Sequence, residues 1–455
     1  MDLGFDTVGN ATLIVYDRGP LLVTDPWIEG PAYFGSWTQS HDIGEEQRAA
    51  IRAARFVWIS HGHPDHLSNQ SVELLREATI LLPDHVGARI ANAFREDGYR
   101  VEVLADRRWT RLSDRVRVYC LTDPAQDALI LIELGDTILA NINDTANSGW
   151  LPLVRREIRG HRKSFVLAAS GYGDIRGMNF FDESGNRLDS FASLRSTTRF
   201  PIGQENARLT DALGGSHYVP FSSMHQYQRA DSVWANASVA SLDDYARGYE
   251  SSRSTVLPGY IRYDAAADCV AALEPGVRPK QVVAPEVFGD VWSDRLDSDE
   301  KADVRRYFQS IEGLSAVVDY VDVCVGGEST IVELASRRFD RGVTFELPRQ
   351  SLMSAVRYEV FEDLFIGNFM KTTYHGKGAF AYGRFINRLK WADNGGARTA
   401  DALSLYLDEY RRRAGLWNRM RFGVEQALIE HAHRLGGDRS AVYRLGRSLY
   451  HRVTR

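Results

Sequence analysis

Residues 56–68 have the sequence Phe-Val-Trp-Ile-Ser-His-Gly-His-Pro-Asp-His-Leu-Ser. The apolar run at the start of this stretch predicts a buried strand, and three histidines and an aspartate follow it at once. In an extended segment alternate side chains point the same way, so His61 and His63 can bind one ion together. Asp65 and His66, at the start of an expected helix, project toward a neighbouring position. Because zinc, iron and manganese accept imidazole and carboxylate ligands, the stretch predicts a metal site.

The composition of the chain bounds its class. With 455 residues, one to three domains are expected, and 44% hydrophobic with 25% charged residues is ordinary for a soluble globular protein. The formal net charge of −5 argues against a nucleic-acid-binding surface. No apolar run approaches the ~20 residues that span a bilayer. The acidic start, Met-Asp-Leu-Gly-Phe-Asp, does not resemble a signal peptide, so we expect a cytoplasmic protein with no membrane partner.

The cysteines support the same compartment. Cys120, Cys269 and Cys324 are scattered and odd in number, which indicates reduced thiols. Each lies in an apolar string and is expected in the core. None forms a CxxC or CxH pair, so cysteine ligation of the metal is not expected.

Strand and helix patterns alternate along the first third of the chain. Strands are expected at 4–16, 20–25, 56–59, 80–82, 100–104, 115–121, 128–134 and 137–142, and helices at 43–55, 69–77 and 86–97. This order predicts two stacked sheets flanked by helices.

The pattern changes further along the chain. Residues 174–215 are loop-rich, which predicts a functional lid or an insertion. A charged helix is expected at 296–312, strands at 316–326 and 329–336, and a basic helical tail at 398–455. The tail is either a solvated face or a surface for an anionic partner. We therefore predict a metal domain at 1–240 and a C-terminal α+β and helical domain at 241–455.

Asp25 is a candidate partner of a metal ligand. It ends a predicted strand and precedes Pro26, which cannot continue the ladder of hydrogen bonds. An aspartate in this position can accept a hydrogen bond from a ligand histidine and fix its tautomer. The alternative is an aspartate that only forms the turn.

The segment from His61 to His66 resembles the HxHxDH signature of the metallo-β-lactamase superfamily. The resemblance implies an α/β (α+β) protein, an αββα sandwich with one or two metals at one edge of the sheets. The C-terminal α+β and helical region would then be an extension. In the superfamily a third histidine precedes a strand, an aspartate that bridges both ions follows the next strand, and a last histidine comes later.

Carried onto this chain, the resemblance implies the remaining ligands. Asp144 follows the strand 137–142 at the bridging position. The third histidine is absent, and Asp123 is the candidate in its place, with Asp127 as the fallback. For the last ligand we favour His225 over His217. The expected ligands are His61, His63 and Asp123 on one ion, Asp65, His66 and His225 on the other, and Asp144 between them.

Longer stretches are similar to the metallo-β-lactamase-like part of the CMP-N-acetylneuraminate hydroxylases. They are Asp25 to Trp37, Ile59 to Ser68, Ile138 to Pro152 and Phe361 to Gly367. This resemblance implies an iron oxygenase. The Rieske iron–sulfur domain of those hydroxylases needs a CxH and a CxxH pair, and this sequence has neither. A carboxylate at position 123 instead resembles the diiron monooxygenases of the same fold.

Two functions follow from this ligand set. It has one more carboxylate than the common hydrolytic set, which stabilises ferric or higher-valent iron. Our first expectation is a dinuclear non-haem iron oxygenase that hydroxylates or N-oxygenates a polar small molecule or a nucleotide-linked substrate. It would use O2 and a separate electron donor, with Asp144, Asp123 and Asp65 at the catalytic centre. The alternative is a zinc or manganese hydrolase of a phosphodiester, lactone or amide. His375 is a possible substrate contact.

Overall fold

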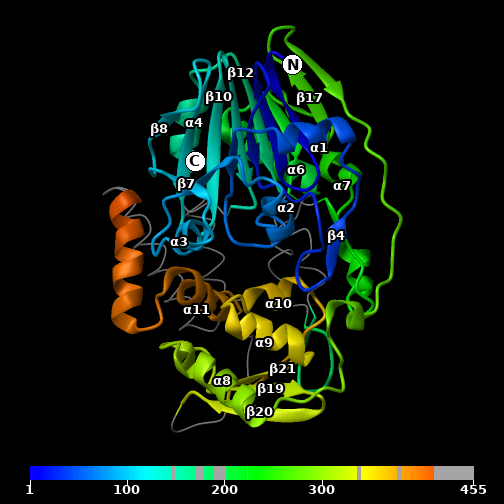
Figure 1. The fold of residues 1–455 in the computed structure, drawn as a ribbon, viewed down its shortest axis with the longest axis vertical. Helices are drawn as coiled ribbons and strands as arrows, with labels where there is room; N and C mark the ends of the chain where they lie inside the picture. The colour runs from blue at the N-terminus through cyan, green and yellow to red at the C-terminus, as the bar shows by residue number, and fades with distance from the viewer. Residues whose placement is uncertain are drawn as a thin grey trace.

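Two sheets packed face to face form the larger part of the molecule, and a third sheet lies beyond one end of them (Figure 1). The computed structural model describes residues 1–145, 149–169, 179–188, 201–222, 224–335, 340–376 and 382–414.

The first sheet has eight strands in the order β18-β17-β1-β2-β3-β5-β6-β7. Their bounds are β1 (Leu3–Val8), β2 (Thr12–Asp17), β3 (Pro20–Thr24), β5 (Phe56–Trp58), β6 (Thr79–Pro83), β7 (Arg100–Leu104), β17 (Ile261–Asp264) and β18 (Cys269–Ala272). Strands β3, β5, β6 and β7 run parallel to one another, so their carboxyl ends share one edge.

The second sheet has seven strands in the order β16-β14-β12-β11-β10-β9-β8. Their bounds are β8 (Trp109–Arg111), β9 (Val116–Thr122), β10 (Ala128–Leu134), β11 (Thr137–Asn143), β12 (Lys163–Ala168), β14 (His217–Pro220) and β16 (Thr255–Val256). Strands β11, β12, β14 and β16 are parallel, whereas β8, β9, β10 and β11 form antiparallel pairs.

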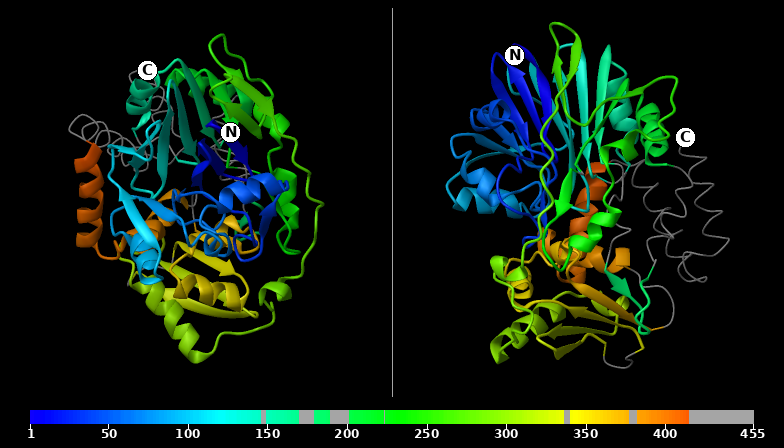
Figure 2. Two further views of the ribbon diagram at one scale, coloured as in Figure 1. Left: turned by 45° about the horizontal axis from the view of Figure 1, so that its top comes forward. Right: turned by 90° about the vertical axis from the view of Figure 1, so that its right-hand side faces the viewer.

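Alternate residues of each strand face different layers. Phe56 and Trp58 pack between the two sheets with Ile130 of the second sheet, whereas Val57 and Ile59 pack on the other face of the first sheet. That face is covered by α1 (Glu45–Arg52), α2 (Asn69–Glu73) and α3 (Arg89–Glu96). The second sheet is covered by α4 (Leu151–Ile158), α6 (Ile202–Leu213) and α7 (Leu242–Ala246) (Figure 2).

This arrangement confirms the predicted αββα sandwich. Because both faces of each sheet are covered, the central strands are buried along their whole length, as every residue of β11 is. Each large apolar side chain buried in this way contributes about 1.5–3 kcal/mol to stability.

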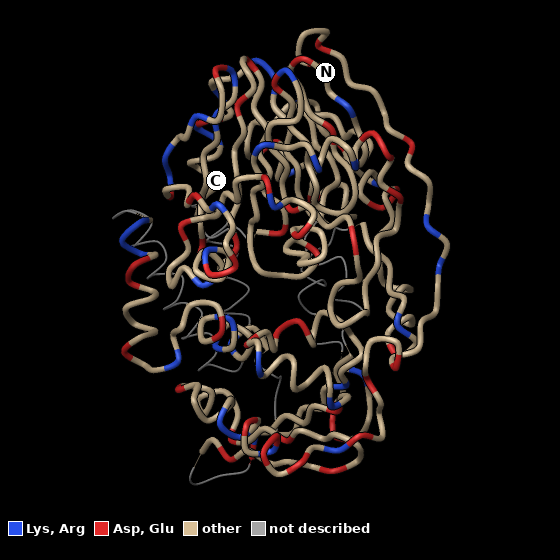
Figure 3. Tube along the Cα trace, in the orientation of Figure 1, with Lys and Arg blue, Asp and Glu red and all other residues tan. Residues whose placement is uncertain are grey.

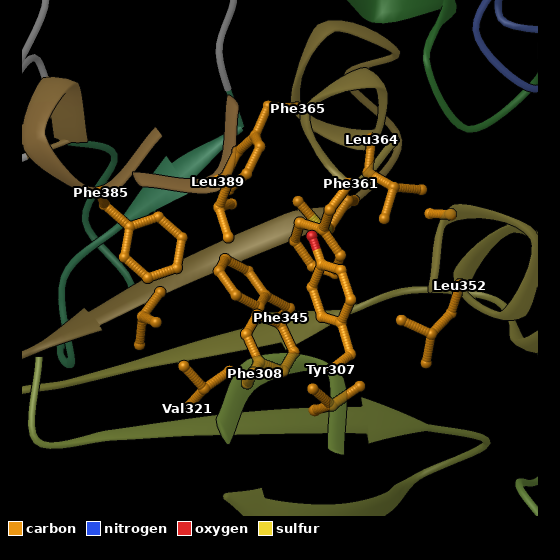
Figure 4. Packing of buried hydrophobic residues seen from close by; sticks show 14 of the residues in the cluster. Tyr307, Phe308, Val321, Phe345, Leu352, Phe361, Leu364, Phe365, Phe385 and Leu389 are labelled. Atoms are coloured by element: carbon orange, nitrogen blue, oxygen red, sulfur yellow. The ribbon is translucent and has the colours of Figure 1, made fainter. Parts of the chain in front are cut away.

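The third sheet has five strands in the order β13-β22-β21-β19-β20. Their bounds are β13 (Phe180–Phe181), β19 (Tyr320–Val325), β20 (Glu328–Glu333), β21 (Gly342–Glu346) and β22 (Lys371–His375). Its helices are α8 (Ser298–Gln309), α9 (Arg349–Arg357), α10 (Glu362–Ile366) and α11 (Tyr382–Gly395). A core rich in phenylalanine joins these helices to the sheet (Figure 4). In Figure 1, α10 and α11 lie between this sheet and the sandwich.

Short elements complete the described chain. Strands β4 (Trp37–Gln39) and β15 (His225–Tyr227) form a separate antiparallel pair. The 3-10 helices are η2 (Val233–Ser238), η3 (Pro285–Phe288) and η4 (Leu314–Ala316), and residues 400–414 are helical.

The chain does not divide between these parts at a single point. Strands β17 and β18 extend the first sheet through β1, so the predicted boundary at residue 240 falls inside the span that builds the sandwich. Strand β13, from before that boundary, belongs to the third sheet. Of the predicted lid at 174–215, residues 174–178 and 189–200 lie outside the described residues. The described part contains the helix α6, which ends where Gly214 adopts a φ of 78°.

The surface carries charges of both signs, interspersed along the whole trace (Figure 3). None of the helices in the described ranges combines the length and apolar character needed to cross a bilayer. The expectation that all three cysteines are core residues is wrong for Cys269, which is exposed on the edge strand β18, whereas Cys120 is buried.

Candidate metal centre

The predicted metal ligands gather at one end of the sandwich. Asp25 follows β3, the segment from His61 to His66 follows β5, and Asp144 follows β11. The turn containing Asp123 joins β9 to β10. Because β9, β10 and β11 are successively antiparallel, this turn lies at the same end as Asp144. This end faces α10 and α11 (Figure 1).

His61 and His63 point their ring nitrogens at a common point. Nε2 of His61 lies 2.8 Å from Nδ1 of His63. In the part of the chain that the structure describes, donor atoms of His61, His63 and Asp144 lie within 4.8 Å of one another, close enough to bind one ion. Burial lowers the pKa of His61 to about 4, so its ring is neutral at neutral pH, the form that binds metal.

Asp144 lies between the two predicted ion positions. Its Oδ2 is 3.7 Å from Nε2 of His61 and 3.8 Å from Nε2 of His66. Its side chain is 36% exposed, and the preceding Asn143 has a φ of 60°. Both contacts come from the same oxygen of Asp144, and its role as a bridging ligand stays a prediction.

Asp65 and His66 form the second part of the centre. Oδ2 of Asp65 is 3.3 Å from Nε2 of His66 and accepts a hydrogen bond from Nδ2 of Asn10 at 2.9 Å. The hydroxyl of Tyr33 donates to Oδ1 of Asp65 at 2.6 Å. Burial opposes protonation of His66, but the charges of Asp65, Asp144 and Asp25 outweigh it and raise the pKa of His66. Metal binding at this histidine therefore displaces a proton.

Asp25 holds the motif from behind and is fully buried. Its carboxylate accepts hydrogen bonds from the backbone amide of Ser60 at 2.7 Å and from the Ser60 hydroxyl at 2.8 Å. It also accepts one from Nδ2 of Asn143 at 2.7 Å and lies 3.1 Å from Nδ1 of His66. Nδ1 of His61 is 2.9 Å from the Ser60 hydroxyl. Asp25 therefore contacts His66 directly and His61 through Ser60, and its role as a partner of metal ligands stays a prediction.

Asp123 and Asp127 occupy different positions in one turn. Oδ1 of Asp123 accepts hydrogen bonds from the backbone amides of Ala125 and Asp127 at 2.8 and 3.2 Å, which is the turn-forming arrangement. Burial and then the Asp127 charge raise the pKa of Asp123. Oδ1 of Asp127 lies 4.0 Å from Nε2 of His61. The geometry thus favours the fallback ligand, and ligation by Asp123 stays a prediction.

His225 is buried among aromatic side chains. It stacks on Trp37 with a ring separation of 3.4 Å, and Trp37 packs against Tyr33, the partner of Asp65. The neighbouring amide of Met224 donates to Asn10, which also bonds Asp65. Ligation by His225 stays a prediction.

The other two candidate histidines lie elsewhere. His217 begins β14 and pairs with Phe165, at the end of its strand opposite the metal centre. His375 lies in the third sheet, where its ring contacts Thr344 at 2.8 Å and Glu183 at 3.3 Å.

The structure adds two residues that sequence reasoning did not select, Glu362 and Lys390. Oε2 of Glu362 lies 3.5 Å from Nε2 of His63, and Oε1 lies 2.9 Å from Nζ of Lys390. Burial would lower the pKa of His63, but Glu362 outweighs it and raises this pKa to about 9. A small cavity of about 20 Å³ adjoins this group and is lined also by Asp127 and Asp363. Glu362 belongs to the stretch Phe361 to Gly367, which resembles the CMP-N-acetylneuraminate hydroxylases. That resemblance was the one sequence feature that could have drawn attention to Glu362.

The donor set fits divalent metal ions. A neutral buried imidazole, converging nitrogens and flanking carboxylates are the ligands that zinc, iron and manganese bind. The outward nitrogens of the three motif histidines each contact a polar partner: Ser60 for His61, Glu362 for His63 and Asp25 for His66. Partners of this kind fix the tautomer and orientation of metal-binding histidines.

Fold and site together describe an αββα sandwich with a candidate metal centre at one end of its sheets. The chain is 25% identical over 287 residues to the cytidine monophosphate-N-acetylneuraminic acid hydroxylase of Sus scrofa, covering 60% of this chain and 64% of that protein. It is 27% identical over 213 residues to the same hydroxylase of Danio rerio, covering 44% of this chain and 34% of the relative. The chain thus matches about a third to two thirds of the length of these relatives. They confirm the resemblance that the sequence motifs indicated.

Two solved structures align with about 60% of the chain. Igni18, a metallo hydrolase from the archaeon Ignicoccus hospitalis, aligns over 60% of this chain and 99% of its own with a TM-score of 0.37 and 12% identity. CmlA, a diiron beta-hydroxylase from Streptomyces venezuelae, aligns over 60% of this chain and 54% of its own with a TM-score of 0.36 and 14% identity. No family model matches the chain. The site and the hydroxylase relatives support a metal-dependent enzyme of this fold, either an oxygenase or a hydrolase.

Paired substitutions separate the two candidate ligands in the turn. We expect Asp127→Asn to weaken metal binding by at least the ~10–100-fold that loss of an outer partner costs. Asp123→Asn should leave metal content unchanged, because asparagine supports the same turn. Metal affinity of both variants, measured by competition with a chelator, checks this. Loss of metal in Asp123→Asn alone would instead establish Asp123 as the ligand.

Proposed function

We propose that the chain is a dinuclear non-haem iron oxygenase that acts on a polar small molecule or a nucleotide-linked substrate. The observation that carries the proposal is the carboxylate-rich donor set: Asp65, Asp144 and Asp127 all lie within 4.0 Å of a motif histidine nitrogen. Anionic oxygen ligands stabilise ferric and higher-valent iron, whereas zinc has no redox chemistry to gain from them. The hydroxylase names of the relatives agree with this choice.

The residues of the chain would hold the ions, orient their ligands and exclude water. His61 and His66 are 3% and 1% exposed, so these two rings are shielded from bulk solvent. Tyr33 and Asn10 fix the orientation of the Asp65 carboxylate through their hydrogen bonds. Iron, when bound, would supply the redox chemistry that activates O2. We propose that a separate protein supplies the electrons.

Metal content and oxygen consumption test the proposal. Protein purified in air should contain iron, about two ions per chain as in other two-metal sites, and show a near-ultraviolet oxo-to-ferric band. Protein loaded with Fe²⁺ in the absence of oxygen should consume O2 when it is mixed with air-saturated buffer, whereas zinc-loaded protein should not. The proposal would be overturned if the purified protein were colourless and contained zinc, and if the iron-loaded protein consumed no O2. That result would favour a hydrolase of a phosphodiester, lactone or amide.

A further inference from the structure

Two charged side chains from the C-terminal half reach the metal centre of the sandwich. Glu362 lies on α10 and Lys390 on α11, and both side chains are only 14% exposed. One oxygen of Glu362 contacts Lys390 at 2.9 Å and the other contacts His63 at 3.5 Å. The carboxylate therefore links a histidine of the sandwich to a helix that packs on the third sheet.

The packing of α10 and α11 aims these two side chains. Phe361 and Leu364, which flank Glu362, are 0% exposed in the core of the third sheet, as is Leu389, the neighbour of Lys390 (Figure 4). Because these apolar residues hold one face of each helix against the sheet, the opposite face of α10 is directed at the sandwich. The phenylalanine-rich core thus fixes the backbone position of Glu362.

The two nitrogens of His63 have different surroundings. Nδ1 lies 2.8 Å from Nε2 of His61 and faces the ion position that these two rings share. Nε2 points the other way, toward Glu362. A metal-binding histidine commonly donates its second N–H to a carboxylate, which fixes the tautomer and makes the ring a better ligand. For His61 and His66 the corresponding partners, Ser60 and Asp25, come from the sandwich itself.

The residue after Lys390 supports the same arrangement. Nε1 of Trp391 donates to the backbone oxygen of Pro124 at 2.9 Å, inside the turn that contains Asp123 and Asp127. The hydroxyl of Tyr406 donates to the same oxygen at 2.7 Å. The C-terminal half therefore contacts two of the segments that carry candidate ligands.

We propose that Glu362 is a positioning residue of the metal centre. It accepts a hydrogen bond from Nε2 of His63 and leaves Nδ1 for the ion, while Lys390 holds the carboxylate in place. The C-terminal half thereby completes a metal centre for which the sandwich supplies the ligands. This inference rests on metal binding alone and holds whether the ion is iron or zinc.

The alternative is that Glu362 and Lys390 form a structural ion pair between two helices. Removing one partner of such a buried pair destabilises the fold, because the other charge is left unpaired. It would change the unfolding transition without changing the affinity for metal. Metal affinity is therefore the measurement that separates the two roles.

The experiment compares Glu362→Gln with the matched control Glu300→Gln in the full chain. Glu300 forms an ion pair with Arg349 between α8 and α9, in the same half of the molecule. We expect Glu362→Gln to bind Co²⁺ about 10–100-fold more weakly in competition with a chelator, and to shift the visible spectrum of the cobalt protein. Glu300→Gln should retain the wild-type affinity and spectrum.

Two further variants keep the test decisive. Lys390→Met should weaken Co²⁺ binding in the same direction, and Glu362→Asp, which keeps the charge but withdraws it by one methylene, covers the case that Glu362→Gln does not fold. Wild-type affinity and spectrum in the folded Glu362 variant would overturn the inference. Because Co²⁺ binding needs neither iron nor O2, this result is independent of whether the enzyme is an oxygenase.

Discussion

Replacement of Asp144 by Ala is expected to remove metal from the centre and abolish oxygen consumption. Asp144 is the one carboxylate placed within 3.8 Å of both His61 and His66 among the described residues, so its loss affects both predicted ion positions. A metal ion supplies several kcal/mol of stabilisation in catalysis, and each ~1.4 kcal/mol is tenfold in rate, so activity should fall about a thousandfold. Metal analysis and O2 consumption of the iron-loaded variant measure both effects.

Asp268→Ala is the control for this substitution. Asp268 is an exposed aspartate that pairs with Arg162 at 2.9 Å, and the exchange should leave metal content and O2 consumption unchanged. If Asp144→Ala retained both ions, the assignment of Asp144 as the bridging ligand would be wrong. Metal binding would then be assigned to the motif histidines without Asp144.

Replacement of Asp25 by Ala is expected to weaken both the centre and the fold. It would leave the Ser60 amide, Asn143 and His66 without the acceptor that all three now share. Removing one partner of a buried charged network costs about 3–5 kcal/mol, and loss of an outer partner lowers metal affinity about 10–100-fold. Chemical denaturation of the metal-free protein and chelator competition measure the two effects separately.

Asp25→Asn separates the acceptor role of this residue from its backbone conformation. Asp25 has a φ of 41°, a left-handed conformation that asparagine adopts at lower cost than alanine. The Asn variant should therefore lose less stability than the Ala variant and still bind metal weakly. Equal stability loss in the two variants would show that the lost hydrogen bonds, and not the backbone, dominate.

The parts of the centre close to a strand end could be predicted from the sequence. His61 to His66 and Asp144 each follow a run of apolar residues, and such runs identify strands buried on both faces. Residues that directly follow such strands are expected at the edge of the sheet where the strands end. The sandwich was predictable for the same reason, because its strands and helices alternate in order.

The remaining features depend on contacts between distant segments. Nothing around Glu362 indicates His63 as its partner, since α10 reads as an ordinary apolar helix with acidic residues at its start. The sequence favoured Asp123 over Asp127, and it could not show that Asp123 accepts the hydrogen bonds of the turn. The division of the chain was hidden because β17, far along the sequence, returns to pair with β1.

That return of β17 has a consequence during synthesis. Until the ribosome has passed residue 264, one edge of β1 has no neighbouring strand, since β17 covers this edge and β18 pairs only with β17. An open strand edge is a template for association with other chains. Nascent chains that stall, or fragments that stop near residue 240, should therefore depend on chaperones and aggregate, although they already carry the histidines of the metal centre.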